Sequence, residues 1–196
     1  MTTLIIYAHP NTPGHAPETL KLVEQYHKEH NLTYEILDLY KMKYDPVLHE
    51  KEHYTSKGYD VSDVNKKIQE KILKTDRLVF IYPVWWNSMP AILKGFIDKV
   101  FIPRYAYHFE PFPIIGGRPI PHLKGKKAAV FLTTGGIKLV YWIFLGRRAS
   151  KLMKIDMLKF FGIKSKVYHY GPAKEIDDKV ISKLSKNVKK GMNWLH

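Results

Sequence analysis

Two kinds of segment alternate along this chain. Short apolar runs rich in branched and aromatic residues have the length and composition of buried strands. Between them lie longer segments in which apolar residues recur every three or four positions, the spacing of one face of a helix. The predicted strands are 3–8, 33–39, 77–83, 127–133 and 165–170. The predicted helices are 18–30, 60–74, 91–101 and 174–194.

Strands that alternate with helices imply a doubly wound α/β fold, with a five-stranded parallel sheet and helices on both faces. We expect a single domain over 1–196, because no repeat or flexible linker interrupts the alternation. The segment 102–126, rich in Pro, Gly and aromatic residues, is expected to be an irregular excursion over the site. Ligands of such sheets bind beyond the carboxyl ends of the strands, near the point where the strand order reverses.

Composition narrows the class of protein. With 196 residues, 45% hydrophobic and 26% charged, the chain is typical of a globular domain. The absence of cysteine excludes a disulfide framework, a thiolate metal site and a cysteine nucleophile. No stretch approaches the roughly 18 apolar residues of a membrane span, and the first residues are typical of a strand rather than a signal peptide. We therefore expect a cytoplasmic protein.

The net charge is strongly positive, +14 from 32 Lys and Arg against 18 Asp and Glu. Such a charge favours anionic partners, which include nucleic acid, an anionic membrane surface and phosphate-bearing cofactors. A base-reading protein would be expected to carry paired zinc ligands or an aromatic RNA-binding signature. The chain has neither, so we expect no nucleic-acid binding.

Unusual residues follow three of the predicted strands. The loop 8–16 is small and polar and leads into a helix N-terminus, where backbone N–H groups can cradle a phosphate, although an ordinary turn has a similar composition. The adjacent Trp85 and Trp86 can clamp a flat ring system. The segment 133–136, Thr-Thr-Gly-Gly, offers two hydroxyls and a backbone that a ligand can approach closely. Together the three loops predict a pocket with a phosphate end and a planar end.

The run 82–101, YPVWWNSMPAILKGFIDKVF, closely resembles the signature of the NAD(P)H:quinone oxidoreductases of flavodoxin-like fold. This group holds the mammalian quinone reductases, the bacterial drug-activity modulators and the ancillary flavoproteins of potassium efflux systems. The segments 8–10, 105–109 and 133–136 follow the family's order, so the resemblance covers most of the chain up to the fourth strand. It implies a homodimer that binds FMN or FAD, takes electrons from NAD(P)H and passes them to a quinone-like acceptor.

The resemblance also implies which residues bind. Those that would hold the flavin phosphate are His9, Thr12 and the backbone of Gly14, His15 and Ala16. Those that would line the isoalloxazine ring are Pro83, Val84, Trp85, Trp86 and Asn87. Those that would bond its polar edge are Thr133, Thr134, Gly135 and Gly136. Tyr107 and Phe109 match aromatics that the family lends across the dimer to the nicotinamide and quinone pocket, which Trp86 also lines, and Asp98 matches an acidic residue near the flavin.

Two segments depart from the family pattern. The family usually has a serine, an aromatic residue and an asparagine at 14–16. Fewer side-chain hydroxyls therefore reach the phosphate in this chain, and backbone N–H groups must supply more of its hydrogen bonds. The polar loop after the two glycines is replaced by the apolar and basic segment 137–148. An ungapped comparison places Tyr141 and Arg147 where the family has a tyrosine and a histidine near the flavin. Both are therefore catalytic candidates, with Arg147 as a cation that stabilises the reduced ring; the alternative is that they are ordinary helix residues.

A second motif points to different chemistry. The segment 49–53, His-Glu-Lys-Glu-His, fits the pattern in which two histidines on a helix bind zinc. However, the segment is short, highly charged and has no apolar face to hold it rigid. We expect a solvated surface turn and no metal site.

The expected function is thus a two-electron transfer from NAD(P)H to a quinone through a flavin, in a ping-pong cycle. Two alternatives stay open: a regulatory subunit docked on a membrane transporter, and a one-electron carrier of flavodoxin type, which the positive charge disfavours. The segment 137–161 joins an apolar run to a basic one. We expect this run to be buried at the dimer interface; the alternative is contact with an anionic membrane or a transporter.

Overall fold

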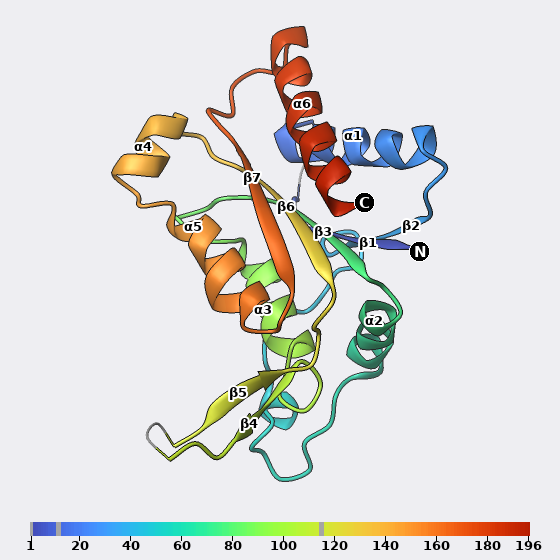
Figure 1. The fold of residues 1–196 in the computed structure, drawn as a ribbon, viewed down its shortest axis with the longest axis vertical. Helices are drawn as coiled ribbons and strands as arrows, with labels where there is room; N and C mark the ends of the chain where they lie inside the picture. The colour runs from blue at the N-terminus through green and yellow to red at the C-terminus, as the bar shows by residue number, and fades with distance from the viewer. Residues whose placement is uncertain (1, 11–12, 114–115) are drawn as a thin grey trace.

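The computed structural model describes residues 2–10, 13–113 and 116–196 (Figure 1). Its centre is a parallel five-stranded sheet with the strand order β2-β1-β3-β6-β7. These strands are β1 (Thr3–Tyr7), β2 (Tyr34–Asp38), β3 (Arg77–Pro83), β6 (Lys127–Thr133) and β7 (Lys164–Tyr170). The order reverses between β1 and β3, which makes their carboxyl ends the switch point of the sheet. The predicted doubly wound fold is confirmed.

Helices cover both faces of this sheet, and α1 and α6 lie together on one side of it (Figure 1). The helices are α1 (His15–Glu29), α2 (Asp63–Leu73), α3 (Ala91–Val100), α4 (Lys138–Ile143), α5 (Arg148–Lys151) and α6 (Asp178–Leu195). A 3-10 turn, η1 (Glu50–Glu52), precedes α2, and α5 continues into a π-helix, η2 (Leu152–Lys159). None of the helices in the described ranges is both long and apolar enough to cross a bilayer.

Alternation along the strands produces two hydrophobic cores, because successive side chains point to opposite faces of a sheet. On β3, Val79 points to the core that holds residues of α1 and α6. Its neighbours Leu78 and Phe80 point to the other core, which holds residues of α2, α3 and η2. Strands buried on both faces need a nearly continuous apolar run, and this is the pattern that identified them.

Residues at the N-termini of two helices explain why these helices begin at other positions than predicted. α1 begins at His15, three residues earlier than expected, because Pro17 is tolerated in a first helical turn. α6 begins only at Asp178, because the side chain of Asp177 accepts a hydrogen bond of 2.7 Å from the N–H of Val180 and caps the helix there.

The segment 102–126 contains a hairpin that the sequence pattern did not predict. β4 (Tyr107–Glu110) pairs antiparallel with β5 (Arg118–Pro121), which carries two prolines. Proline argues against a strand in the middle of a sheet, but both strands of a two-stranded ribbon are edges, so the missing N–H can face outward. The hairpin lies at the end of the sheet where β6 begins, opposite the end that leads to α4 (Figure 1).

Candidate functional site

Three loops meet at the carboxyl ends of β1, β3 and β6. The N–H of Ala8 donates to the carbonyl of Ile81 at 3.0 Å, and the N–H of Val84 donates to the carbonyl of Thr133 at 2.7 Å. These two bonds extend the sheet past its last paired residues and hold the loops side by side. The residues predicted on these three loops are therefore neighbours in the fold.

The first loop leads into an uncapped helix N-terminus. Gly14 precedes α1 and supplies no side-chain cap, which leaves the first-turn N–H groups of His15 and Ala16 for another acceptor. The His15 ring is buried and stacks on Tyr170 at 5.5 Å between centroids. Burial lowers the pKa of His15, so the ring is neutral near pH 7. Of the other predicted residues, His9 lies two residues after the end of β1, and Thr12 lies outside the described residues.

The second loop is a tight turn built on an unfavourable backbone. Trp85 and Ser88 exchange two backbone hydrogen bonds of 3.0 and 2.9 Å, and the residues between them, Trp86 and Asn87, have φ values of 49° and 60°. Turns with two such residues usually contain glycine or asparagine. Trp86 is nonetheless fully exposed, at 101% of its reference area. A large aromatic side chain held in solvent on a strained turn is typical of a binding site.

Asn87 adds an unused acceptor beside this tryptophan. Its side-chain oxygen is buried and has no hydrogen-bond partner in the described part of the structure. Buried polar atoms in folded proteins nearly always have a partner, so this oxygen is available to accept a hydrogen bond from water or from a ligand. Pro83 and Val84, which precede the turn, are buried and half-buried and support it from below.

The third loop joins buried hydroxyls to open glycines. The Thr134 hydroxyl donates to the carbonyl of Gly136 at 3.0 Å and lies 2.8 Å from Nε2 of His169. Since its one hydrogen goes to Gly136, His169 must donate from Nε2 to Thr134. Thr133 is buried, whereas Gly135 and Gly136 are exposed, with no atom within 4 Å of where a Cβ would lie. A flat ligand can therefore lie directly against this backbone.

Sequence reasoning missed His169 and Gly171, which brace the third loop from β7. A Cβ on Gly171 would lie 2.7 Å from the carbonyl oxygen of Gly136 and would collide with the Thr134 hydroxyl. Both residues come at or just after the end of the fifth strand. That position was the available signal, because the carboxyl ends of all strands meet at the same edge.

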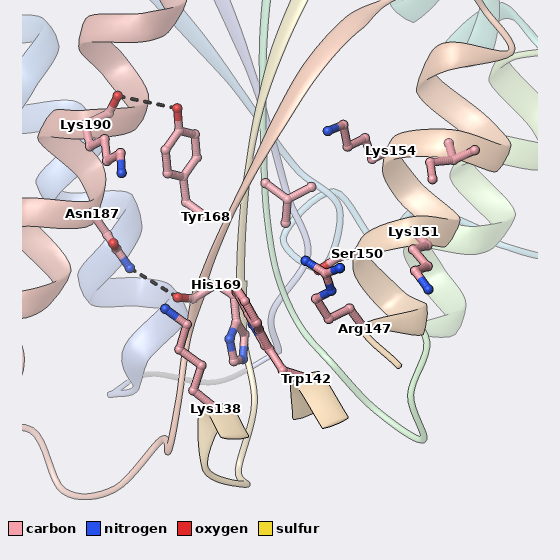
Figure 2. Close-up of a pocket in the computed structure, with 12 residues that line it drawn as sticks. Lys138, Trp142, Arg147, Ser150, Lys151, Lys154, Tyr168, His169, Asn187 and Lys190 are labelled. Carbon is pink, nitrogen blue, oxygen red and sulfur yellow. Dashed lines mark hydrogen bonds between the residues drawn. The ribbon is translucent and has the colours of Figure 1, made fainter. Parts of the chain in front are cut away.

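The two catalytic candidates lie apart. The Tyr141 ring is buried and stacks on His169 at 4.3 Å, and its hydroxyl bonds Ser150 Oγ at 2.8 Å. The guanidinium of Arg147 lies 4.8 Å from the ring centroid of Trp142, in a hollow outside β7 (Figure 2). Tyr141 thus contacts His169, which in turn bonds Thr134 on the third loop. The catalytic roles of both residues stay predictions.

The predicted acceptor aromatics lie at the opposite end of the sheet from Trp86. Tyr107 and Phe109 are on β4, and the Tyr107 ring packs edge-on against Phe160 at 4.8 Å. Figure 1 shows this hairpin far from the carboxyl ends of the strands. Within one chain, Tyr107 and Phe109 therefore share no pocket with Trp86.

The zinc-like segment has ordinary structural partners. His49 bonds Asp45 at 2.7 Å, and His53 bonds Thr55 at 2.8 Å. No group of three metal-ligating side chains that could hold an ion occurs in residues 2–10, 13–113 and 116–196. Asp98, matched to an acidic residue near the flavin, is exposed and pairs with Lys94 at 2.7 Å.

Comparison with known proteins agrees with this geometry. A family model described as flavodoxin-like fold matches residues 1–190. The chain belongs to this family. A protein of Haemophilus influenzae named an uncharacterized NAD(P)H oxidoreductase is 30% identical over 183 residues, which cover 91% of this chain and 88% of the relative.

Two solved structures extend the comparison of this flavodoxin-like chain. Smu.1420 from Streptococcus mutans is 32% identical with a TM-score of 0.83, over 98% of this chain and 100% of that one. An NAD(P)H:quinone oxidoreductase from Methanothermobacter marburgensis is 26% identical with a TM-score of 0.78, over 100% of this chain and 98% of that one. The resemblance to NAD(P)H:quinone oxidoreductases of flavodoxin-like fold is confirmed.

Proposed function

We propose that this protein transfers electrons from NAD(P)H to quinones or related acceptors through a bound flavin, in a ping-pong cycle. The observation that carries the proposal is Trp86, fully exposed on a left-handed turn between an uncapped helix and two open glycines. Such an arrangement offers donors for a phosphate at one end and a flat apolar surface at the other. The names of its relatives support the same reaction.

The three loops fit the part that FMN and FAD share. We propose that the N–H groups of His15 and Ala16 hold the phosphate, while Trp85 and Trp86 flank the ring system. The unpaired oxygen of Asn87 is a ready acceptor for a ring N–H. When bound, the flavin supplies the capacity to accept and release hydride. The protein positions donor and acceptor in turn against that ring.

Tyr141 is proposed as a positioning residue. Its buried ring stacks on His169, His169 donates to Thr134, and Thr134 in turn donates to Gly136. This chain of contacts holds the backbone of the glycine loop in place. The role that the family resemblance implies for Arg147, stabilisation of the negative charge on the reduced ring, stays a prediction, because its guanidinium lies over Trp142 in the hollow outside β7.

We propose that a second copy completes the site. Tyr107 and Phe109 lie at the wrong end of their own sheet, so only the partner's copies can stand beside the flavin ring. The chain also exposes seven apolar side chains on and beside α4, which we call the α4 apolar run: Ile137, Leu139, Val140, Trp142, Ile143, Phe144 and Leu145. Exposed patches of this kind mark interaction sites.

The experiment is flavin binding followed by turnover. The purified protein should bind FMN or FAD at micromolar concentration, its flavin absorbance should bleach on anaerobic addition of NADH or NADPH, and a quinone should restore it. Failure to bind either flavin would overturn the proposal. Bleaching without reoxidation by quinones would instead favour a regulatory flavoprotein or an electron carrier.

A further inference from the structure

A hollow of about 370 Å³ lies outside the edge strand β7, between α4 and α5 on one side and α6 on the other (Figure 2). This volume is within the range of small-molecule sites. Of the residues in the three flavin-binding loops, none lines it. We call it the β7 hollow.

The β7 hollow is lined by five cations and no carboxylate. The cations are Lys138, Arg147, Lys151, Lys154 and Lys190. None of them forms an ion pair with a carboxylate in the described part of the chain. The ion pairs found there all involve other cations. Grouped like charges repel one another, and a concave wall strengthens their common field. All five side chains are exposed, and an anion that lies between them would relieve their mutual repulsion.

Part of this charge is held in place before any ligand arrives. Arg147 and Lys138 both lie over the ring of Trp142, at 4.8 and 5.2 Å from its centroid. Cation–π contacts of this kind restrict long side chains that would otherwise sample many rotamers. On the other wall, Asn187 donates to the carbonyl of His169 at 3.3 Å, which fixes the floor of the hollow (Figure 2). Less ordering is then needed on binding.

We propose that the β7 hollow binds a small anion that carries two or more phosphate groups. A phosphate monoester carries about 1.5 to 2 negative charges at pH 7, so two or three groups balance five cations. Arginine and lysine are the usual phosphate ligands, and Arg147 can bind two oxygens at once. The volume also exceeds the need of a single inorganic ion.

The pKa of His169 should change when an anion binds in the β7 hollow. It lines the hollow, and its Nδ1 is buried without a partner in the described structure. Because Nε2 donates to Thr134, Nδ1 is an unprotonated acceptor. Burial and the charge of Lys138 lower the pKa of His169 to about 4. An anion bound beside it favours protonation at Nδ1 and will raise that pKa.

The test is titration of the protein with pyrophosphate at constant ionic strength, with binding measured by calorimetry. Removing two charges from the hollow with Lys151→Gln and Lys154→Gln should weaken binding about tenfold or more. The matched control, Lys183→Gln with Lys186→Gln, removes the same charge from exposed positions on α6 and should change Kd less than about twofold. Neither pair is part of the proposed flavin site, so the result does not depend on flavin binding.

Three further measurements separate the alternatives. The pKa of His169, followed by NMR, should rise on addition of pyrophosphate and stay unchanged in the Lys151/Lys154 variant. The proposal is overturned if the protein binds orthophosphate as tightly as pyrophosphate. It is also overturned if both double variants weaken pyrophosphate binding equally. So does binding to vesicles of anionic phospholipid with none to soluble pyrophosphate, which would assign the same cations to a membrane surface.

Discussion

The ammonium group of Lys99 lies 3.0 Å from Oε2 of Glu52, and both side chains are largely buried, at 5% and 16% exposure. Lys99 also donates to the carbonyl oxygens of Asp45 and Val47, at 3.1 and 2.9 Å. Glu52 belongs to the segment that resembles a zinc motif. The pair therefore gives that segment a structural role, because it ties the connection after β2 to α3.

Replacing Lys99 with methionine should destabilise the protein by about 3 kcal/mol, since it leaves the largely buried Glu52 carboxylate without its charged partner, although the N–H of His49 still donates to it at 3.2 Å. The free energy of unfolding in urea measures the loss. Lys94→Met is the matched control, because the Lys94–Asp98 pair is exposed and its removal should cost less than about 1 kcal/mol. Equal losses for both variants would contradict this account of the segment 49–53.

Trp86→Gly should raise stability and weaken flavin binding at the same time. Glycine removes the strain of φ 49°, a gain of about 1 kcal/mol, and the exposed indole contributes no core packing that could be lost. Flavin affinity should fall because the ring loses its aromatic neighbour. Thermal unfolding and fluorescence titration with FMN measure the two effects.

A control separates the backbone effect from the loss of the ring. Arg104 is exposed, has φ 71° and lies outside the proposed site, so Arg104→Gly should stabilise the protein without changing flavin affinity. If Trp86→Gly instead destabilised the fold and left flavin affinity intact, Trp86 would be a packing residue.

The sheet was predictable because its strands are buried on both faces. Such strands need unbroken apolar runs, and β3 and β6 match their predicted bounds of 77–83 and 127–133. The hairpin of β4 and β5 was not predicted, because two prolines in β5 oppose a strand unless one of its edges is free. The local apolar pattern of the sequence predicts the core strands. The hairpin could not be predicted in this way, because its prolines are tolerated only where a strand edge is exposed to solvent.

The site was predictable only as a set of loops. The ends of the predicted strands placed Trp86 and Gly135 at the same edge of the sheet, and the structure agrees. The contribution of His169 was not visible, because its bond to Thr134 joins two strands 35 residues apart in the sequence. The sequence likewise could not predict that Tyr107 lies far from Trp86, because their separation depends on the direction in which α3 returns across the sheet.

Gly171→Ala should weaken flavin binding through the third loop. The added methyl would lie 2.7 Å from the carbonyl oxygen of Gly136 and must displace that loop. We expect about a tenfold loss of affinity. Gly117→Ala is the control, because its new methyl would meet Phe109 at an ordinary 3.6 Å. An unchanged affinity in Gly171→Ala would show that the loop position does not matter for the flavin.

The stability of the protein should fall as the pH drops from about 6.5 toward 4. Burial and, for His169, the charge of Lys138 hold the pKa of His169 and His196 at about 4 in the folded state. The unfolded chain takes up protons first, near pH 6.5, so acid favours unfolding. Between pH 7 and 5, His169 alone should contribute up to about 2 kcal/mol of this loss.

His169→Gln tests this assignment, because glutamine can still donate to Thr134 but does not titrate. Its free energy of unfolding should depend less on pH over the same range than that of the unchanged protein. Urea unfolding at pH 7 and pH 5 measures the difference. An identical pH dependence in both proteins would mean that His169 is not held neutral.

The α4 apolar run supplies the last prediction. Leu139, Ile143 and Phe144 are 62%, 64% and 78% exposed in a single chain, and a stable protein rarely leaves so many large apolar side chains in water. If they form the contact with a second copy, Leu139→Ser with Phe144→Ser should shift the protein from dimer to monomer in sedimentation experiments. The variant should keep its fold, because neither side chain belongs to the core. It should also lose quinone reduction, since the partner's Tyr107 and Phe109 no longer reach the flavin.

A matched control is Val47→Ser with Leu73→Ser, which removes exposed apolar side chains elsewhere and should leave the dimer intact. A monomeric unchanged protein that floats with anionic vesicles at low salt would instead assign the run to a membrane surface.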